Sequence, residues 1–248
     1  MIRTEFIKGH GGETIAVHRA GQGRPVLMLH GFIANTDLNW VQPGILAAVA
    51  DAGFEAIAPD LRGHGQSAAP TDPAAWPPDV LAMDQEALIA ALGLTDYDLV
   101  GYSLGARTAV RMMVRGARPR RAVLGGMGDS GVMQAGARAA MFEDSIRNGE
   151  NAANPQAGKY IQARIRAGGF KAEALLGVLS SFAATALADL AALDLPILVV
   201  SGQDDQDNGS AEHLAAALPN GKAMRIPGDH LSAVAEPALA RAIIDWLA

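Results

Sequence analysis

The chain has 248 residues, half of them hydrophobic and 19% charged, with a formal net charge of −6 at pH 7. This composition is typical of a globular protein with a sizeable core, and the charges do not form the basic stripe of a nucleic-acid-binding protein. The absence of cysteine excludes disulfides, thiolate metal sites and a cysteine nucleophile.

The N-terminal residues contain no apolar segment of signal-peptide length, and no apolar stretch is long enough to span a membrane. We therefore expect a soluble, cytoplasmic protein without a nucleic-acid or membrane partner. No pattern in the sequence indicates an oligomeric state.

Strand-like and helix-like segments alternate along most of the chain. Strands are expected at residues 3–8, 14–19, 25–29, 54–59, 97–101, 121–124, 196–201 and 222–226, and helices at 45–52, 79–92, 106–114, 211–218 and 236–247. The first two strands form a predicted hairpin, and the third is an apolar run typical of a buried parallel strand. This alternation predicts a mainly parallel sheet with helices on both faces, in which ligands bind beyond the carboxyl ends of the strands.

Residues 131–195 interrupt this alternation. The segment contains no convincing strand, is rich in alanine and helix-like, and is broken at Asn148–Pro155 and Gly168–Gly169. The strand pattern resumes at Pro196. The sequence therefore separates residues 131–195 from the segments before and after it.

Gly101-Tyr102-Ser103-Leu104-Gly105 is the most informative motif, because it follows a predicted strand and leads into a predicted helix. The glycines two residues before and after Ser103 remove Cβ atoms that would clash in a sharp turn. The Ser103 hydroxyl is then exposed at a strand end, beside a helix N-terminus whose N–H groups suit an anion. Ser103 is therefore a candidate nucleophile, which needs a base, an orienting acid and an oxyanion hole.

His30-Gly31-Phe32 directly follows the strand at residues 25–29 and is a candidate donor loop. The backbone N–H of Phe32 could pair with that of Leu104 to hold the negative oxygen of a tetrahedral intermediate. The alternative is that His-Gly is only a turn after a strand. The serine motif downstream favours the oxyanion hole.

Two adjacent aspartates, Asp204 and Asp205, follow the strand at residues 196–201. A carboxylate at this strand end could orient a histidine and stabilise its charged form. We favour Asp205 as the acid, with Asp204 next and Asp129, which also follows a strand, as a third alternative. At least two of Asp204, Asp205 and Asp207 must simply solvate a turn.

His230 follows the last predicted strand, at the end of Pro227-Gly228-Asp229. A histidine on such a loop can take the serine proton through Nε2 and return it to the leaving group. Of the six histidines, His230 alone combines a loop after a strand with the order Ser, Asp, His along the chain. His230 is therefore the candidate base.

Residues 59–67 form a polar loop, broken by glycines, after another strand. A functional interpretation would place Arg62 or His64 in the site. The favoured interpretation is that Asp60, Arg62 and His64 satisfy one another and the loop backbone. Gly125–Gly128 similarly indicate close backbone packing near the pocket wall, since no Gly-Lys-Ser/Thr sequence of a phosphate loop follows.

Together these motifs resemble the α/β-hydrolase family in kind and in chain order. The resemblance covers most of the chain, and residues 131–195 fall where the family inserts a helical cap. It implies an α/β fold with an eight-stranded, mostly parallel sheet and helices on both faces. Residues 1–130 and 196–248 would form this core, and 131–195 the cap.

Residue by residue, the resemblance implies Ser103 as nucleophile, His230 as base, Asp205 as acid, and the N–H groups of Phe32 and Leu104 as oxyanion hole. It implies no metal and no organic cofactor. The serine at position 103 argues against haloalkane dehalogenases and epoxide hydrolases, which resemble this fold but use aspartate there.

The leading hypothesis is a serine hydrolase that acts on a small-molecule substrate and cleaves a small or medium carboxylic ester or lactone through an acyl-enzyme. One alternative is hydrolysis of a C–C bond in a dienoate or diketone by the same triad. Such substrates usually carry a carboxylate, and its candidate anchors are the cap arginines Arg138, Arg147, Arg164 and Arg166. An alternative of a different class is a ligand receptor that keeps the triad but turns over slowly.

Apolar side chains of the segment 131–195 either line the pocket or form core contacts between cap helices. These residues are Met133, Met141, Phe142, Leu175, Leu176 and Phe182.

Overall fold

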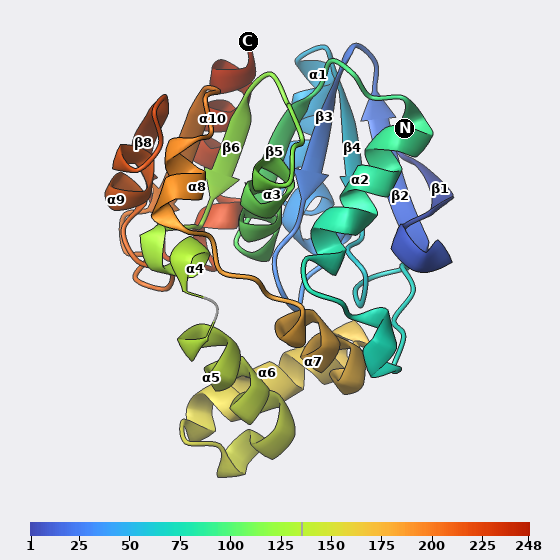
Figure 1. Cartoon of the computed structure of the whole chain (residues 1–248), viewed down its shortest axis with the longest axis vertical. Coiled ribbons are helices and arrows are strands. Elements are labelled where there is room, and N and C mark those ends of the chain that lie inside the picture. The colour runs from blue at the N-terminus through green and yellow to red at the C-terminus, as the bar shows by residue number, and fades with distance from the viewer. Residues whose placement is uncertain (135) are drawn as a thin grey trace.

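Eight strands form one twisted sheet in the computed structural model, which describes residues 1–134 and 136–248 (Figure 1). The strands are β1 (Arg3–Lys8), β2 (Thr14–Gly21), β3 (Arg24–Leu29), β4 (Phe54–Pro59), β5 (Asp98–Tyr102), β6 (Ala122–Gly125), β7 (Ile197–Gly202) and β8 (Gly221–Ile226). Their order is β1-β2-β4-β3-β5-β6-β7-β8, with β2 antiparallel to both of its neighbours and every other pair parallel. The predicted fold class and hairpin are confirmed.

Alternate side chains of the central strands enter two separate hydrophobic cores, because successive residues of a strand point to opposite faces. In β3, Val26 and Met28 pack into one core, and Leu27 and Leu29 into the other. The first core contains side chains of α1 (Ile45–Asp51) and α10 (Pro237–Leu247). The second contains side chains of α2 (Val80–Leu92), α3 (Leu104–Val114), α8 (Leu187–Ala191) and α9 (Ala211–Ala216).

Three helices lie beyond the carboxyl ends of the parallel strands, as Figure 1 shows below the sheet. They are α5 (Ala137–Asn148), α6 (Pro155–Gly168) and α7 (Ala172–Ser180). Ile146, Ile161 and Leu175 form a third hydrophobic cluster together with Ile33 of the loop after β3. Helix α7 also contributes Ala174 and Val178 to the core that contains α3. The short helix α4 (Asp129–Met133) instead contributes Val132 to the core that contains α3.

Within the described residues, the segment between β6 and β7 contains helices and no strand. The division of the chain at residues 131 and 195 stays a prediction. No helix in the described part of the chain combines the length and apolar character needed to cross a membrane.

The sheet changes direction between β3 and β5, and this position brings two loops together. The chain passes from β3 outward to β4 on one side, and continues from β5 to β8 on the other. The loops that follow β3 and β5 are therefore neighbours at a topological switch point, where open α/β sheets bind ligands. These loops carry Phe32 and Ser103.

Helix α3 begins at Leu104, two residues before the predicted start at Ala106. Gly105 thus lies in the first turn of the helix, where its lack of a side chain allows close packing. A Cβ atom at Gly105 would overlap the backbone carbonyl of Leu29, at the end of β3. The start of α3 is therefore held directly against the strand that carries the donor loop.

The first prediction concerns this close approach. Alanine normally stabilises a helix by about 1 kcal/mol relative to glycine, but at position 105 the overlap is with backbone that cannot give way. We expect Gly105→Ala to lower the free energy of unfolding by about 3 kcal/mol, within the usual range for overpacking. Urea denaturation would measure it, with Gly136→Ala, where a Cβ atom meets open space, as the control. Equal stability of the two variants would contradict the packing argument.

Candidate active site

Ser103 lies in the sharp turn between β5 and α3, with φ 52° and ψ −111°. A non-glycine residue with positive φ is strained by about 1–3 kcal/mol, and the surroundings must hold it in place. The Ser103 N–H donates to the Gly125 carbonyl at 2.8 Å, and Gly101 and Gly105 approach too closely for a Cβ atom on Gly101. The Ser103 side chain makes no capping bond to its own helix, so the hydroxyl is free to face another partner.

That partner is His230, whose Nε2 lies 3.0 Å from Ser103 Oγ. On the other side of the ring, Nδ1 lies 2.9 Å from Oδ2 of Asp205. Because an ionised carboxylate only accepts hydrogen bonds, Nδ1 carries a proton and Nε2 can accept the serine proton. The structure thus brings three of the predicted site residues into one hydrogen-bonded chain, with the Asp205 side chain 3% exposed and that of His230 11% exposed.

Burial by itself raises the pKa of Asp205, but hydrogen bonding and nearby charge outweigh it, and the pKa lies below its ordinary value. The hydrogen bond and charge of His230 contribute, and the Asp207 N–H donates to Asp205 Oδ1 at 2.9 Å. The positive charge of Arg138 acts in the same direction. Asp205 is therefore an anion at neutral pH, as the tautomer of His230 requires.

The two alternative acids lie elsewhere. Asp204 is exposed, next to Asp205 in the turn after β7. The Asp129 carboxylate accepts hydrogen bonds from the N–H groups of Ser130 and Ser210, each at 2.9 Å, and lies 3.5 Å from His213. In residues 1–134 and 136–248, Asp205 provides the carboxylate that His230 contacts.

Tyr102, to which the sequence analysis gave no role, holds the loop that carries the histidine. Its hydroxyl donates to the backbone carbonyl of His230 at 2.8 Å. Cβ atoms on Gly125 and Gly126 would lie only 2.7 and 2.8 Å from the Tyr102 ring. The glycine run after β6 therefore makes room for this ring, which explains the close packing that the sequence indicated.

The candidate oxyanion donors lie on the wall of a cavity beside Ser103, which Phe32 and Leu104 both line. Leu104 is the first residue of α3, and the first N–H groups of a helix have no acceptor inside it. The preceding donor loop is fixed by Asn39, whose side-chain Oδ1 accepts from the Gly31 N–H at 2.6 Å.

Two buried histidines hold the backbone around this loop. His30 Nε2 accepts from the Leu61 N–H at 2.9 Å, and His64 Nε2 accepts from the Ile33 N–H at 3.3 Å. Nε2 of each ring is therefore unprotonated, and Nδ1 donates to a backbone carbonyl. Burial lowers the pKa of both, and that of His64 to about 3, with the neighbouring His30 adding to the effect. Both rings are neutral supports.

The rest of the polar loop at residues 59–67 is also structural. Asp60 accepts from the N–H groups of Thr36 and Gln66 at 2.9 and 2.8 Å. The Arg62 guanidinium forms a bidentate, fully buried ion pair with Asp84 of α2, at 3.0 and 2.7 Å. The loop backbone is satisfied as expected, but the partner of Arg62 is Asp84, which the sequence analysis did not name.

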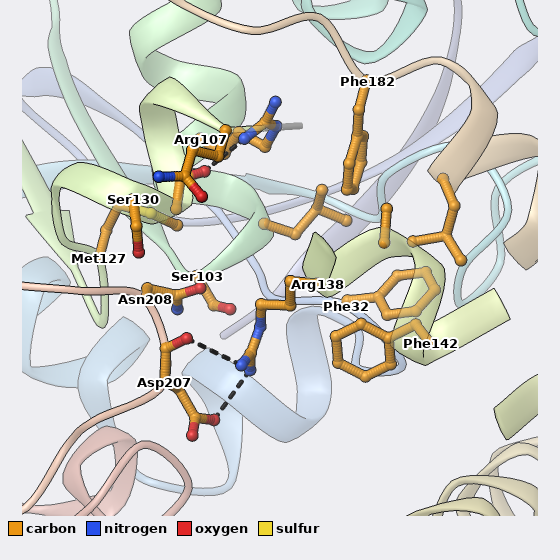
Figure 2. A pocket seen from close by; sticks show the side chains of 15 residues that line it. Phe32, Ser103, Arg107, Met127, Ser130, Arg138, Phe142, Phe182, Asp207 and Asn208 are labelled. Atoms are coloured by element: carbon orange, nitrogen blue, oxygen red, sulfur yellow. Dashed lines mark hydrogen bonds and ion pairs between the residues drawn. The ribbon is translucent and has the colours of Figure 1, made fainter. Parts of the chain in front are cut away.

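Two cavities open beside Ser103, with volumes of about 210 and 590 Å³. Five residues line both: Phe32, Ser103, Arg138, Phe142 and Asp207. In Figure 2, Arg138 lies between Asp207, to which it is bonded, and the rings of Phe32 and Phe142. His230 lines only the larger cavity.

The apolar side chains of the segment 131–195 divide between the two predicted roles. Met141, Phe142 and Phe182 line the cavities. Leu175 and Leu176 belong to the cluster between the three helices, and Met133 packs against the core of the sheet.

One group of side chains in the described residues has a spacing compatible with a metal ion, namely Asp205, Asp207 and His230. Its ligand atoms are already engaged. The Nδ1 atom of His230 bonds to Asp205 at 2.9 Å, and the Asp207 carboxylate bonds to Arg138 at 2.8 Å. The arrangement fits proton transfer better than metal binding.

Comparisons with known proteins support the same fold. A family model described as alpha/beta hydrolase fold matches residues 24–124. An epoxide hydrolase of Caballeronia sordidicola is 39% identical over 98 residues, which make up 40% of this chain and 29% of that protein. A non-heme chloroperoxidase of Kitasatospora aureofaciens is 42% identical over 106 residues, 42% of this chain and 37% of that protein. The match therefore spans less than half of each relative.

Among solved structures, a thermophilic esterase from Thermogutta terrifontis is similar with a TM-score of 0.76 and 26% sequence identity. The likeness covers 99% of this chain and 98% of the esterase chain. It therefore includes the three helices beyond the sheet as well as the sheet itself.

The second prediction follows from the neutral ring of His64. The folded protein leaves this ring unprotonated down to pH about 3, whereas the unfolded chain binds a proton below its ordinary pKa of 6.5. Between pH 6.5 and about pH 3, the unfolded state therefore binds more protons than the folded state. His64 should lower the free energy of unfolding by about 1.4 kcal/mol for each pH unit below 6.5.

Urea denaturation of the wild type and of His64→Gln between pH 7 and pH 4 would measure this slope. We expect the variant to lose stability less steeply with acid. His213→Gln, which replaces an exposed histidine, controls for the loss of an imidazole as such. Parallel curves for the wild type and His64→Gln would refute the assignment.

Proposed function

We propose that the chain, whose residues 24–124 match the alpha/beta hydrolase fold, is a serine hydrolase that cleaves a small or medium carboxylic ester or lactone. The observation that carries the proposal is the hydrogen-bonded chain from Ser103 through His230 to Asp205, at 3.0 and 2.9 Å. This is the arrangement of nucleophile, base and orienting acid that acyl transfer requires.

In the first half of the reaction, the Ser103 oxygen attacks the substrate carbonyl while His230 Nε2 takes the serine proton. Asp205 holds the ring in the required tautomer and stabilises the imidazolium that forms. The N–H groups of Phe32 and Leu104 donate to the oxygen of the tetrahedral intermediate. The carbon–oxygen bond of the ester then breaks, and the leaving oxygen takes the proton from His230.

In the second half, water attacks the acyl-enzyme with His230 as general base, and the acid product leaves. The residues that line the two cavities support one orientation of the substrate, with its two parts in different cavities. Since His230 must protonate the leaving oxygen and lines only the larger cavity, the leaving group occupies that cavity. The acyl group then occupies the smaller cavity, beside Leu104.

The hydroxyl at position 103 favours this chemistry over that of the similar epoxide hydrolase. Proteins of this fold that open epoxides or remove halides use an aspartate at the corresponding turn, and its carboxylate forms an alkyl ester with the substrate. A serine activated by a histidine attacks acyl carbons instead.

The third prediction tests the nucleophile. The wild type should hydrolyse p-nitrophenyl esters or lactones, and Ser103→Ala should reduce kcat by about 10⁴-fold or more, as for removal of a triad member elsewhere. The panel contains p-nitrophenyl esters of increasing acyl length, several lactones and one ring-cleavage dienoate, with release of product followed by absorbance. Full activity of Ser103→Ala on an aryl ester would refute the proposal. Hydrolysis of the dienoate alone would favour the C–C bond hydrolase.

The fourth prediction tests the acid with a matched pair of neighbours. Asp205→Asn removes the charge that fixes the histidine tautomer, and we expect kcat to fall by about 10³–10⁴-fold. Asp204→Asn changes an exposed side chain one residue away and should keep kcat within about twofold of the wild type. The reverse order of the two effects would transfer the role of acid to Asp204.

A further inference from the structure

Arg107 is a buried cation beside the candidate nucleophile. It lies on α3, and its backbone N–H donates to the carbonyl of Ser103, four residues earlier, at 3.0 Å. Its residue exposure is only 6%, yet it lines the smaller cavity together with Ser103 and Leu104. Figure 2 shows Arg107 between Ser130 and Phe182 in this pocket.

No carboxylate in the described residues forms a salt bridge with Arg107. Its two terminal nitrogens donate to the backbone carbonyls of Gly131 and of Ala183, the second at 2.7 Å, and its guanidinium lies 4.7 Å from the centre of the Phe182 ring. These partners leave three of its five N–H donors without a bond in the described chain.

The acid whose charge acts on Arg107 is already bonded to another arginine. Asp79 favours the charged form of Arg107, but its two oxygens bind Arg111 at 2.9 and 2.7 Å. Burial and the neighbouring Arg111 lower the pKa of Arg107 to about 10, which still leaves it charged at neutral pH. A buried charge without a counter-ion is unfavourable, and an anion in the cavity would remove this penalty.

The other polar groups of the smaller cavity offer no competing anion. Ser130, Gln134 and Asn208 are uncharged, and Asp207 is bonded to Arg138. Arg107 is thus the one cation lining this cavity, within the residues that the structure describes, that has no acidic partner of its own.

We propose that Arg107 binds a carboxylate on the acyl group of the substrate, which is then a monoester of a short dicarboxylic acid. This inference rests on the proposed function. Attack by Ser103 breaks the carbon–oxygen bond of the substrate ester, and the alcohol departs into the larger cavity with the proton from His230. Water then breaks the ester bond of the acyl-enzyme, which restores the Ser103 hydroxyl and releases the dicarboxylic acid.

The dimensions of the cavity favour a short acid. One helical turn separates the Cα atoms of residues 103 and 107 by about 6 Å along the axis. A volume of about 210 Å³ is below the roughly 300–1,000 Å³ of pockets for drug-sized ligands. A chain of a few carbons between the two carboxyl carbons fits these limits, as in glutarate.

Two matched substrates test the inference. The mono-p-nitrophenyl ester of glutaric acid carries the second carboxylate, and p-nitrophenyl valerate has a methyl group in its place. We expect the wild type to prefer the glutarate ester in kcat/KM, and Arg107→Gln to lower the ratio of the two kcat/KM values by about 10- to 100-fold, as for loss of a charged hydrogen bond. The ratio within one variant cancels any general loss of folded enzyme.

Two further variants test whether the preference for the glutarate ester depends on Arg107 rather than on another arginine. Arg115→Gln, at the end of the same helix and bonded to Glu86, should keep the wild-type ratio. Arg138→Gln tests the other arginine of the smaller cavity. The inference is wrong if Arg107→Gln keeps the preference, if Arg138→Gln removes it in place of Arg107→Gln, or if the wild type cleaves the valerate ester equally well.

A binding measurement separates this inference from the proposed function. Calorimetry should show that glutarate binds Ser103→Ala, and that adding Arg107→Gln weakens binding at least about tenfold. Unchanged affinity would overturn the carboxylate site even if the esters are cleaved. Failure of the wild type to cleave either ester, with Arg107-dependent binding of glutarate intact, would overturn the proposed function and leave the carboxylate site standing.

Discussion

The contact between the start of α3 and the end of β3 is the constraint on which the site depends. Gly105 and the Leu29 carbonyl touch without room for a side chain, so the turn at Ser103 and the loop after β3 have a fixed separation. The strained turn at Ser103 and the donor loop at Phe32 lie on the two sides of this contact. The relative position of the turn at Ser103 and the donor loop in the candidate site thus follows from backbone packing between α3 and β3.

The loops around the candidate site are held by neutral or paired groups, and an ionised carboxylate lies within the site itself. His30 and His64 support the donor loop as uncharged rings, so their support does not disturb the potential around an anionic intermediate. The buried charge of Arg62 is matched by Asp84. The Asp205 carboxylate would gain a directly bonded counter-charge when His230 becomes protonated, which is the event that acyl transfer would produce. The groups that hold the loops are thus neutral or paired, whereas the Asp205–His230 pair can change its charge.

Periodicity and turn residues were sufficient to predict the eight strands, most to within one residue, because the sheet buries regular apolar runs. The sequence predicts the start of α3 two residues too late, because glycine has a low helix propensity. Gly105 lies in the helix because its close contact with the Leu29 carbonyl leaves no room for a side chain. The sequence alone cannot distinguish Asp204 from Asp205, because the residues of a turn do not indicate which of two adjacent side chains points toward His230. Arg107 escaped notice because an arginine on a helix is usually exposed, and here Phe182, distant in sequence, covers it.

Tyr102 precedes the nucleophile in the chain and holds the carbonyl of the base. The candidate nucleophile and base are therefore both anchored at the end of β5, while α5, α6 and α7 share a hydrophobic cluster with Ile33 of the donor loop. Under the proposed function, the alcohol part of the substrate meets side chains of α5 and α6 in the larger cavity. Substitutions in those helices can then change which alcohols are accepted, while Ser103, His230, Asp205 and Arg107 lie outside them.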